Sequence, residues 1–387
     1  MTDARSRRGR GSLAVSFFVQ GVTFALLVTR IPAIQDRYGI SDALLPVFLA
    51  AVPVLAGVGS VLTGKLVRRV APSVVLRWAQ PVVLLALLAL GAGERLWHVG
   101  VALGVFGLAV GALDASMNML GVSLQRAYGR SIMLGFHAAY SLGGIVGASL
   151  AWVGAHGELA LVVSYLPVVA VLLPVALVGS RWYVEGEPGR GGPVGRSGGV
   201  LVPLCLVLMF AYIGDSTVAN WSAKYLADVL GGSEELATVP YNAYMVTTLL
   251  GRAVGDLAVR RFGAVAVVRG GAVLAAAGFA VVAGAPGAWA GVAGFTVLGL
   301  GLSVVVPQAF AAARSDAEVA RLNVFNYVGF LVGSPLVGAL GDAWSYRGAM
   351  LLPLVLVLVM LRYATAVGGE RALYGGGHER PRTVDVG

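Results

Sequence analysis

Charged side chains are scarce in this chain. They make up 12% of its 387 residues, whereas hydrophobic residues make up 58%, and the mean hydropathy is +0.83. A typical soluble protein carries about 25% charged residues, so a soluble fold of this size could not cover so large an apolar core. The composition therefore excludes an ordinary soluble fold and predicts a polytopic membrane protein.

Cysteine and the common catalytic motifs are also lacking. Cys205 is the single cysteine and lies in an apolar run, which excludes an intrachain disulfide framework and suits a small core side chain. The chain has no G-x-x-x-x-G-K-[ST] phosphate loop, no H-E-x-x-H motif and no G-x-S-x-G elbow. We therefore expect no ATP-driven motor, no metal, no cofactor and no enzymatic activity.

Long apolar runs are what the sequence has in quantity. About 20 residues cross a hydrocarbon core of roughly 30 Å as a helix, and twelve runs are long enough. They cover residues 12–30, 43–63, 74–93, 97–122, 132–154, 159–179, 200–220, 237–258, 264–284, 287–307, 322–341 and 348–366. The first run lacks a small-residue cleavage site, so we interpret it as a retained span rather than a signal peptide.

A polar segment divides these runs into two sets of six. Residues 180–199 are rich in Gly, Pro and Arg and have no apolar period, as expected of a flexible linker. We predict an all-α membrane protein whose twelve transmembrane helices form two six-helix bundles related by pseudo-two-fold symmetry. The predicted units are an N-terminal half (1–179), a linker (180–199), a C-terminal half (200–367) and a polar tail (368–387).

Lysine and arginine gather in the loops of one side. The net charge is +9, but the basic residues stand in small groups between apolar runs, which indicates membrane topology rather than nucleic-acid binding. By the positive-inside rule, both termini and the linker are cytoplasmic. We expect a multi-pass protein of the cytoplasmic membrane that works as a monomer.

A short motif occurs twice. Residues 59–70 read GSVLTGKLVRRV and residues 251–262 read GRAVGDLAVRRF, 192 positions apart. Each copy follows the second helix of its half, which indicates a duplicated six-helix unit.

This arrangement resembles the major facilitator superfamily. The segment GRAVGDLAVRRFG (251–263) is similar to that superfamily's G-x-x-x-D-x-x-x-R-x-G loop signature. The resemblance implies a gating motif that holds the halves together in the outward-open state. Its matching residues are Gly251, Arg252, Asp256, Arg260, Arg261 and Gly263, with Arg68 and Arg69 in the first copy. Gly64 replaces the aspartate there, so we expect a carboxylate latch in the second half alone.

A narrower resemblance concerns the branch. The segments TRIPAI (29–34), GALDASMNMLG (111–121), GFHAAYSLGGIVG (135–147) and NWSAKYL (220–226) resemble a poorly characterised bacterial branch related to the sugar and fucose permeases. The branch implies a transporter and says little about the substrate. Those relatives often carry an acid in the first helix, and none occurs here.

Two ionisable residues interrupt apolar helices. Asp114 lies in the fourth run with Asn118 one turn later, and His137 lies in the fifth run. Such residues at membrane depth cost about 2.5–3.5 kcal/mol and so mark functional sites. We predict that Asp114 and His137 lie at a similar depth and couple transport to protons. The alternatives are a capped structural acid, and a histidine that bonds a helix backbone or lies near the lipid headgroups.

Further polar residues are candidates for a substrate cavity, because they stand within apolar runs. They are Gln20, Thr23, Asn118, Asp215, Asn220, Trp221, Asn242, Tyr244 and Asn326. Gly214 before Asp215 suggests a discontinuous seventh helix of the kind that lines binding sites. Helix association, an aromatic-belt anchor for Trp221 and helix capping for Asn326 are the competing interpretations.

The sequence thus predicts a secondary transporter that moves a small solute across the bilayer by alternating access, in proton symport. A sugar or another small polar molecule is the expected substrate. An exporter or facilitator of amphipathic compounds, and a membrane sensor that has lost transport, remain alternatives.

Overall fold

The structure, a computed structural model, describes residues 4–41, 44–184, 198–237 and 239–370. Most of the predicted linker (185–197) and of the predicted tail (371–387) lies outside these ranges. The described residues form helices and connecting turns, with no strand among them. The predicted all-α class is confirmed.

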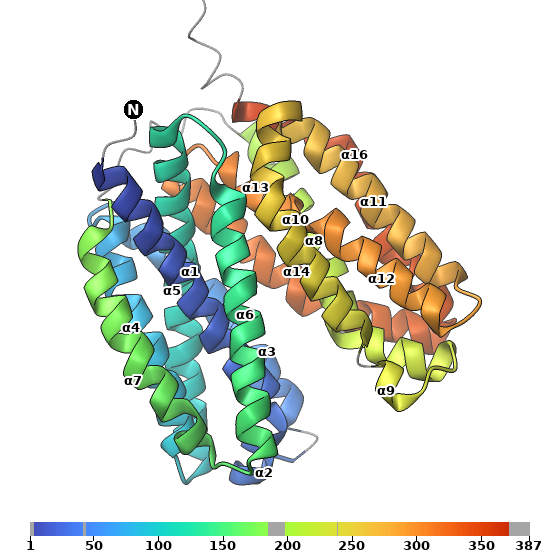
Figure 1. Cartoon of the computed structure of the whole chain (residues 1–387), viewed down its shortest axis with the longest axis horizontal. Coiled ribbons are helices and arrows are strands. Elements are labelled where there is room, and N and C mark those ends of the chain that lie inside the picture. Colours follow the sequence, from blue (N-terminus) through green and yellow to red (C-terminus); the bar gives the residue numbers. More distant parts are fainter. Residues whose placement is uncertain (1–3, 42–43, 185–197, 238, 371–387) are drawn as a thin grey trace, which may run out of the picture.

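The first part of the chain forms six long helices and one short one (Figure 1). They are α1 (Ala4–Thr29), α2 (Ile31–Tyr38), α3 (Leu45–Leu66), α4 (Pro72–Ala92), α5 (Leu96–Tyr128), α6 (Met133–His156) and α7 (Leu161–Gly179), followed by a 3-10 turn, η1 (Ser180–Trp182). The short helix α2 was not predicted, because eight amphipathic residues are too few to register as a span.

The second part contains α8 (Gly198–Lys224), the π-helical turn η2 (Tyr225–Val229), α9 (Glu234–Ala237), α10 (Val239–Phe262), α11 (Ala264–Gly284), α12 (Ala288–Ser303), α13 (Val305–Ala311), α14 (Asp316–Ala343), α15 (Tyr346–Ala349), α16 (Leu351–Tyr363) and the 3-10 turn η3 (Ala364–Glu370). Eleven described segments are long and apolar enough to cross a membrane. The remaining predicted span is α10, which is 24 residues long but carries Arg252, Asp256, Arg260 and Arg261.

Several helices are longer than the apolar runs that predicted them. Helix α1 begins at Ala4 rather than residue 12, α5 continues to Tyr128 rather than 122, and α14 begins at Asp316 rather than 322. Hydropathy detects only the part of a helix that lies in hydrocarbon, whereas the backbone hydrogen bonds continue into the polar region.

The tenth predicted span is two helices rather than one. Helices α12 and α13 meet at Val304. Pro307 has no N–H with which to bond the Ser303 carbonyl one turn earlier, so the helix breaks there. The freed carbonyl accepts a hydrogen bond from Arg252 Nε at 3.4 Å.

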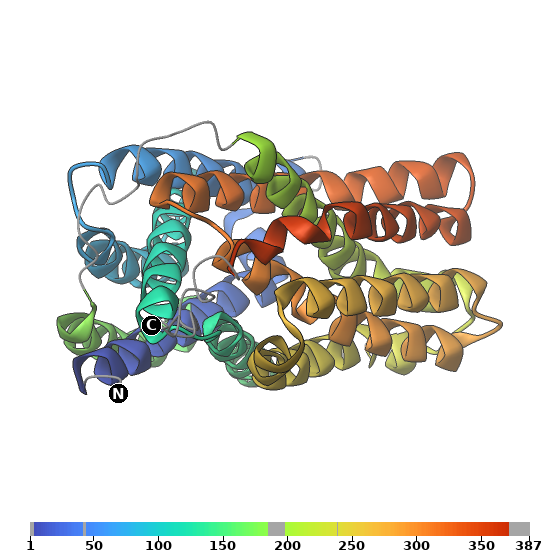
Figure 2. The ribbon, with the colours of Figure 1, turned by 90° about the horizontal axis from the view of Figure 1, so that it is seen from above.

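The long helices form two groups, α1 to α7 and α8 to α16. Helix α3 packs along α14, and α6 packs along α10, so these two pairs join the groups (Figure 2). The groups meet near the start of α1 and the hinge between α5 and α6, which we call the closed end. They diverge toward α2 and α9, which we call the open end (Figure 1).

Contacts inside the two groups repeat at the same offset of 192 residues as the sequence motif. Ser60 Oγ donates to the Gly111 carbonyl at 3.1 Å, and Arg252 makes its bond to Ser303 at the matching positions. Gly107 lies against the Val52 backbone, and Gly299 lies against the Tyr244 backbone. A side chain at either glycine would force the packed helices apart.

Candidate functional site

Asp114 lies at the junction of the two helix groups. Its carboxylate accepts hydrogen bonds from Gln20 Nε2 of α1 and from the Tyr327 hydroxyl of α14. Asp114 keeps part of its surface accessible although it lies in the middle of α5. An acid in the middle of a long apolar helix is therefore held from both groups at once.

A second acid is held in a similar way within the second group. Asp215 of α8 accepts a hydrogen bond of 2.5 Å from the Tyr244 hydroxyl of α10. Asp215 is half-buried and Tyr244 is buried. The predicted break near Gly214 is wrong, because α8 is continuous from Gly198 to Lys224. The irregular turn follows α8, at η2, where the backbone hydrogen bonds take the π-helical pattern.

Two further tyrosines lie near both acids. Tyr140 of α6 and Tyr212 of α8 each interact electrostatically with both Asp114 and Asp215. Both tyrosines are half-buried. The two carboxylates therefore face one shared, tyrosine-rich region.

Arg252 is the cation of this region. It interacts electrostatically with Asp215, but its hydrogen bonds go to Ser141 Oγ of α6, at 2.6 Å, and to the Ser303 carbonyl. Among the described residues neither carboxylate forms an ion pair. The salt bridge found among these residues joins Lys224 to Asp228. Arg252 thus lies deeper than a loop motif implies, ten residues before the end of α10.

His137 lies apart from Asp114. It is 7% exposed, and its ring packs against Phe17 at 5.3 Å and Phe310 at 6.2 Å between centroids. The expectation of a similar depth is wrong. Asp114 precedes the end of α5 by fourteen residues, about 21 Å, whereas His137 follows the start of α6 by four, about 6 Å.

Buried amide groups flank Asp114 and leave their oxygens without donors. Gln20, 4% exposed, uses its nitrogen on Asp114 and leaves Oε1 unpartnered. Asn118, 3% exposed, donates to the Asp114 carbonyl at 2.9 Å and leaves Oδ1 unpartnered. Unsatisfied buried acceptors cost about 1–3 kcal/mol each, so each needs an explanation.

Four of the other predicted cavity residues form hydrogen bonds with groups other than Asp114. Thr23 and Asn220 bond carbonyls one turn earlier in their own helices, at 2.7 and 2.9 Å. Trp221 donates to the Ser334 carbonyl of α14 at 3.0 Å. Asn242 is exposed near the start of α10. Asn326 is buried and bonds Asn323 at 3.4 Å.

At the closed end, Asp256 of α10 reaches the first turn of α6. Its carboxylate accepts hydrogen bonds from Ser131 Oγ at 2.6 Å, from Leu134 N at 3.3 Å and from Gly135 N at 3.0 Å. A carboxylate at a helix N-terminus satisfies free N–H groups and complements the helix dipole. Arg260 adds two bonds to the Ser131 carbonyl, at 3.2 and 2.7 Å.

The matching place in the first group holds no carboxylate. A Cβ on Gly64 would lie 2.8 Å from Ala320 Cβ of α14, closer than real contacts allow. Helix α14 is capped by its own residues instead, because Ser315 Oγ accepts from Glu318 N at 3.3 Å. Arg68, Arg69 and Arg261 are exposed. Gly251 packs against Ser303, and Gly263 adopts a φ of 85° before α11.

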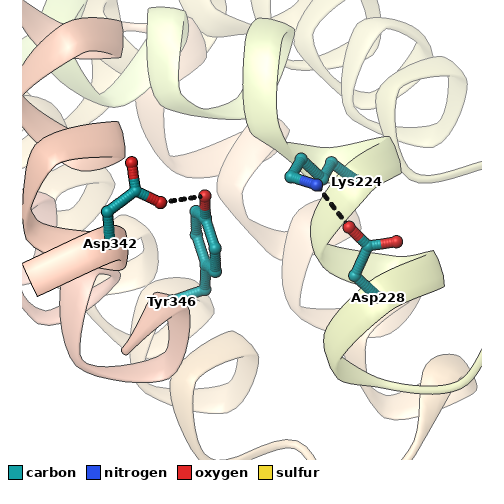
Figure 3. Close-up of polar contacts among 4 residues, drawn as sticks. All are labelled: Lys224, Asp228, Asp342 and Tyr346. Atoms are coloured by element: carbon teal, nitrogen blue, oxygen red, sulfur yellow. Dashed lines mark hydrogen bonds and ion pairs between the residues drawn. The ribbon is translucent and has the colours of Figure 1, made fainter. Parts of the chain in front are cut away.

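An exposed polar cluster lies at the open end of the second group (Figure 3). Lys224 pairs with Asp228, and the Tyr346 hydroxyl donates to Asp342 at 2.8 Å. The second pair has the same chemistry as Tyr327 with Asp114, but in solvent.

Sequence reasoning missed some members of the site. Tyr140, Tyr212, Ser141 and Tyr327 are not among the residues predicted from the sequence. Their signal was weak, because tyrosine and serine are common in apolar helices. Their position opposite the acids depends on helices distant in sequence.

Comparisons with known proteins agree with the fold. No family model matches the chain. It is 29% identical over 366 residues to an uncharacterised MFS-type transporter of Yersinia pestis, covering 92% of this chain and 95% of that one. It is 27% identical over 361 residues to the membrane protein MosC of Rhizobium meliloti, covering 88% and 85%.

Solved structures with the same fold include transporters of different solutes. The major facilitator superfamily transporter FucP, in its outward conformation, aligns with a TM-score of 0.78 at 17% identity, covering 92% of this chain and 97% of that one. The human organic anion transporter MFSD10 aligns with a TM-score of 0.81 at 14% identity, covering 94% and 100%. The shared fold and the sequence similarity together agree with the resemblance of this multi-pass membrane protein to transporters of the major facilitator superfamily.

Proposed function

We propose that the protein is a secondary active transporter that moves a small solute by alternating access and is coupled to protons through Asp114. In this proposal the twelve long spans, α10 included and α12 with α13 counted as one, form two six-helix halves. Residues 1–179 and 200–367 make the halves, with a linker at 180–199 and a tail from 368. Both termini face the cytoplasm, the membrane is the cytoplasmic one, and the protein acts as a monomer.

The position of Asp114 is the observation that carries the proposal. Its carboxylate is bonded to α1 of the first half and to α14 of the second. Alternating access requires the halves to move against each other, so this bond pattern must change during transport. Protonation removes the charge and one acceptor site, which biases one conformation.

The conformation of the chain fits the proposed orientation. The bonds from Asp256 and Arg260 to the start of α6 hold the closed end together. With both termini inside, the closed end is cytoplasmic and the protein faces outward. The solute would enter from the open end and meet the tyrosine-rich region between Asp114 and Asp215. Small polar solutes, sugars among them, suit such a region.

A distance measurement tests the coupling without knowledge of the substrate. Val47 of α3 and Trp344 after α14 are exposed at the open end of opposite halves. Spin labels there, in a Cys205→Ser background, report its closure by double electron–electron resonance. We expect shorter distances at pH 5 than at pH 8, and short distances at both values in Asp114→Asn.

Two results would oppose the proposal. One is a wild-type distance distribution that does not change between these pH values. The other is an Asp114→Asn variant that keeps the full change. His137→Gln provides a comparison, because a shared role in coupling predicts that it too reduces the pH response.

A further inference from the structure

We infer that the solute carries a protonated amine, which binds at Asp114 and donates N–H bonds to Gln20 and Asn118. This inference rests on the proposed transport function and names the substrate class of that site.

The first argument is the balance of charge. The shared region contains the carboxylates of Asp114 and Asp215 and the guanidinium of Arg252, whose hydrogen bonds are committed to serine residues. Neither carboxylate has an ion-pair partner among the described residues. Negative charge inside a membrane is costly unless a cation compensates it. A cationic solute supplies that compensation when it binds.

The second argument is the balance of donors and acceptors. The unpartnered oxygens of Gln20 and Asn118 belong to buried amides that already contact Asp114 through their nitrogens. The contacts to Asp114 fix the orientation of both amides, since only the nitrogen can donate. The site thus presents acceptors that lack donors. An ammonium group has three N–H donors and no acceptor, so it can supply the donors that these oxygens lack.

The third argument is the aromatic surface. Tyr140 and Tyr212 lie near both acids, and Tyr327 and Tyr244 donate hydrogen bonds to them. Tyrosine faces attract cations through the ring quadrupole. A neutral polar solute could donate hydrogen bonds here but would not compensate the negative charge, and an anion would be repelled by both carboxylates.

The same geometry predicts competition with protons. Asp114 cannot hold a proton and pair fully with an ammonium group at the same time. Binding of the amine should therefore weaken as the pH falls. Proton and solute would then exchange at Asp114, rather than bind together as symport requires.

Matched ligand pairs test the inference in purified protein by thermal shift and by titration calorimetry. D-glucosamine with D-glucose, and 2-phenylethylamine with 2-phenylethanol, each replace a hydroxyl by an ammonium on the same body. We expect at least one amine to raise the melting temperature and to bind at least tenfold tighter than its alcohol at pH 8. That preference should shrink at pH 5.

Variants assign the preference to residues. Asp114→Asn should abolish it. Asn118→Leu, which keeps the carboxylate, should reduce it severalfold and provides a second test if Asp114→Asn does not fold. Asp342→Asn, at the exposed Tyr346 pair, is the matched control and should leave it unchanged.

Three outcomes would overturn the inference: alcohols that bind as tightly as their amines, no shift with either amine, or a preference that survives Asp114→Asn. The pH-dependent distance change needs no ligand. If it persists through Asp114 while the amines fail, the proton-coupled function stands and the substrate class is wrong. If the amines bind but the distance does not respond to pH, the substrate class stands and the proton-coupled function is wrong.

Discussion

Asp114 and Asp342 present the same bond, from a tyrosine hydroxyl to a carboxylate, in two environments. Tyr327 reaches Asp114 between the helix groups, whereas Tyr346 reaches Asp342 at the surface (Figure 3). Water replaces a lost donor at the surface and cannot do so as freely in the interior. The environment of each pair, rather than the hydrogen bond itself, therefore decides how much the pair contributes to the stability of the fold.

The two tyrosines should therefore respond differently to removal of the hydroxyl. Tyr327→Phe deprives a partly buried carboxylate of a donor, and hydrogen bonds to charged groups contribute about 1.5–3 kcal/mol. Tyr346→Phe should change stability by about 0.5 kcal/mol or less, as exposed substitutions usually do. Chemical denaturation in detergent micelles measures both. Equal losses would show that Asp114 is as well solvated as Asp342.

At the level of single residues, the sequence identified both acids and two of their partners, Gln20 and Tyr244, but not the third partner, Tyr327. An acid in an apolar run is conspicuous because of its cost, whereas Tyr327, 213 positions from Asp114, is not. The depth of His137 was misjudged for a related reason. Its distance from Asp114 depends on how far α5 continues beyond its apolar run, and hydropathy does not report that.

Among the helices, the break between α12 and α13 couples backbone chemistry to the site. Pro307 frees the Ser303 carbonyl, which then helps to position Arg252. The sequence predicted one span here because the composition stays apolar through the break. The sequence shows Pro307, but it does not show that the carbonyl freed by the missing N–H accepts a hydrogen bond from Arg252 of α10.

Restoring the missing N–H should restrain this element. Pro307→Ala allows the residue to bond the Ser303 carbonyl, so α12 and α13 should become one helix and the pH-driven change in open-end distance should become smaller. The matched control is Pro335→Ala, because Pro335 lies within the unbroken helix α14. An undiminished distance change in Pro307→Ala would separate the break from the transport motion.

Across the whole molecule, the closed end is fastened unequally. The second copy of the repeated motif places Asp256 on the start of α6, and the first copy places Gly64 against Ala320. The sequence predicted this difference from one missing carboxylate. It did not predict that Ser315 would cap α14 in its place, nor that no room is left for an acid at Gly64.

Loss of Asp256 should therefore loosen the closed end. Ala313 is 2% exposed and its carbonyl accepts a bond of 2.5 Å from Arg126, so a cysteine there reports opening. In a Cys205→Ser background, Asp256→Ala should raise the maleimide reaction rate of Ala313→Cys at least fivefold. Asp342→Ala is the control, and an unchanged rate in Asp256→Ala would show that the contact does not hold this end.

An acid added to the first copy should not create a second latch. In Gly64→Asp the new side chain meets Ala320, so we expect faster labelling of Ala313→Cys, as in Asp256→Ala. Slower labelling would mean that α14 shifts to accept the carboxylate and that the first copy of the motif can form the same contact as the second.

The position that corresponds to Pro307 in the first group, 192 residues earlier, is Ala115. It lies in the middle of α5, which is continuous over 33 residues. The first helix group thus has one continuous helix at the position where the second group has two shorter helices. The two units are alike in plan and unequal in stiffness. In the proposed alternating-access motion the two groups need not move alike: the second group could bend at the break near Pro307, while the first group turns as a rigid body.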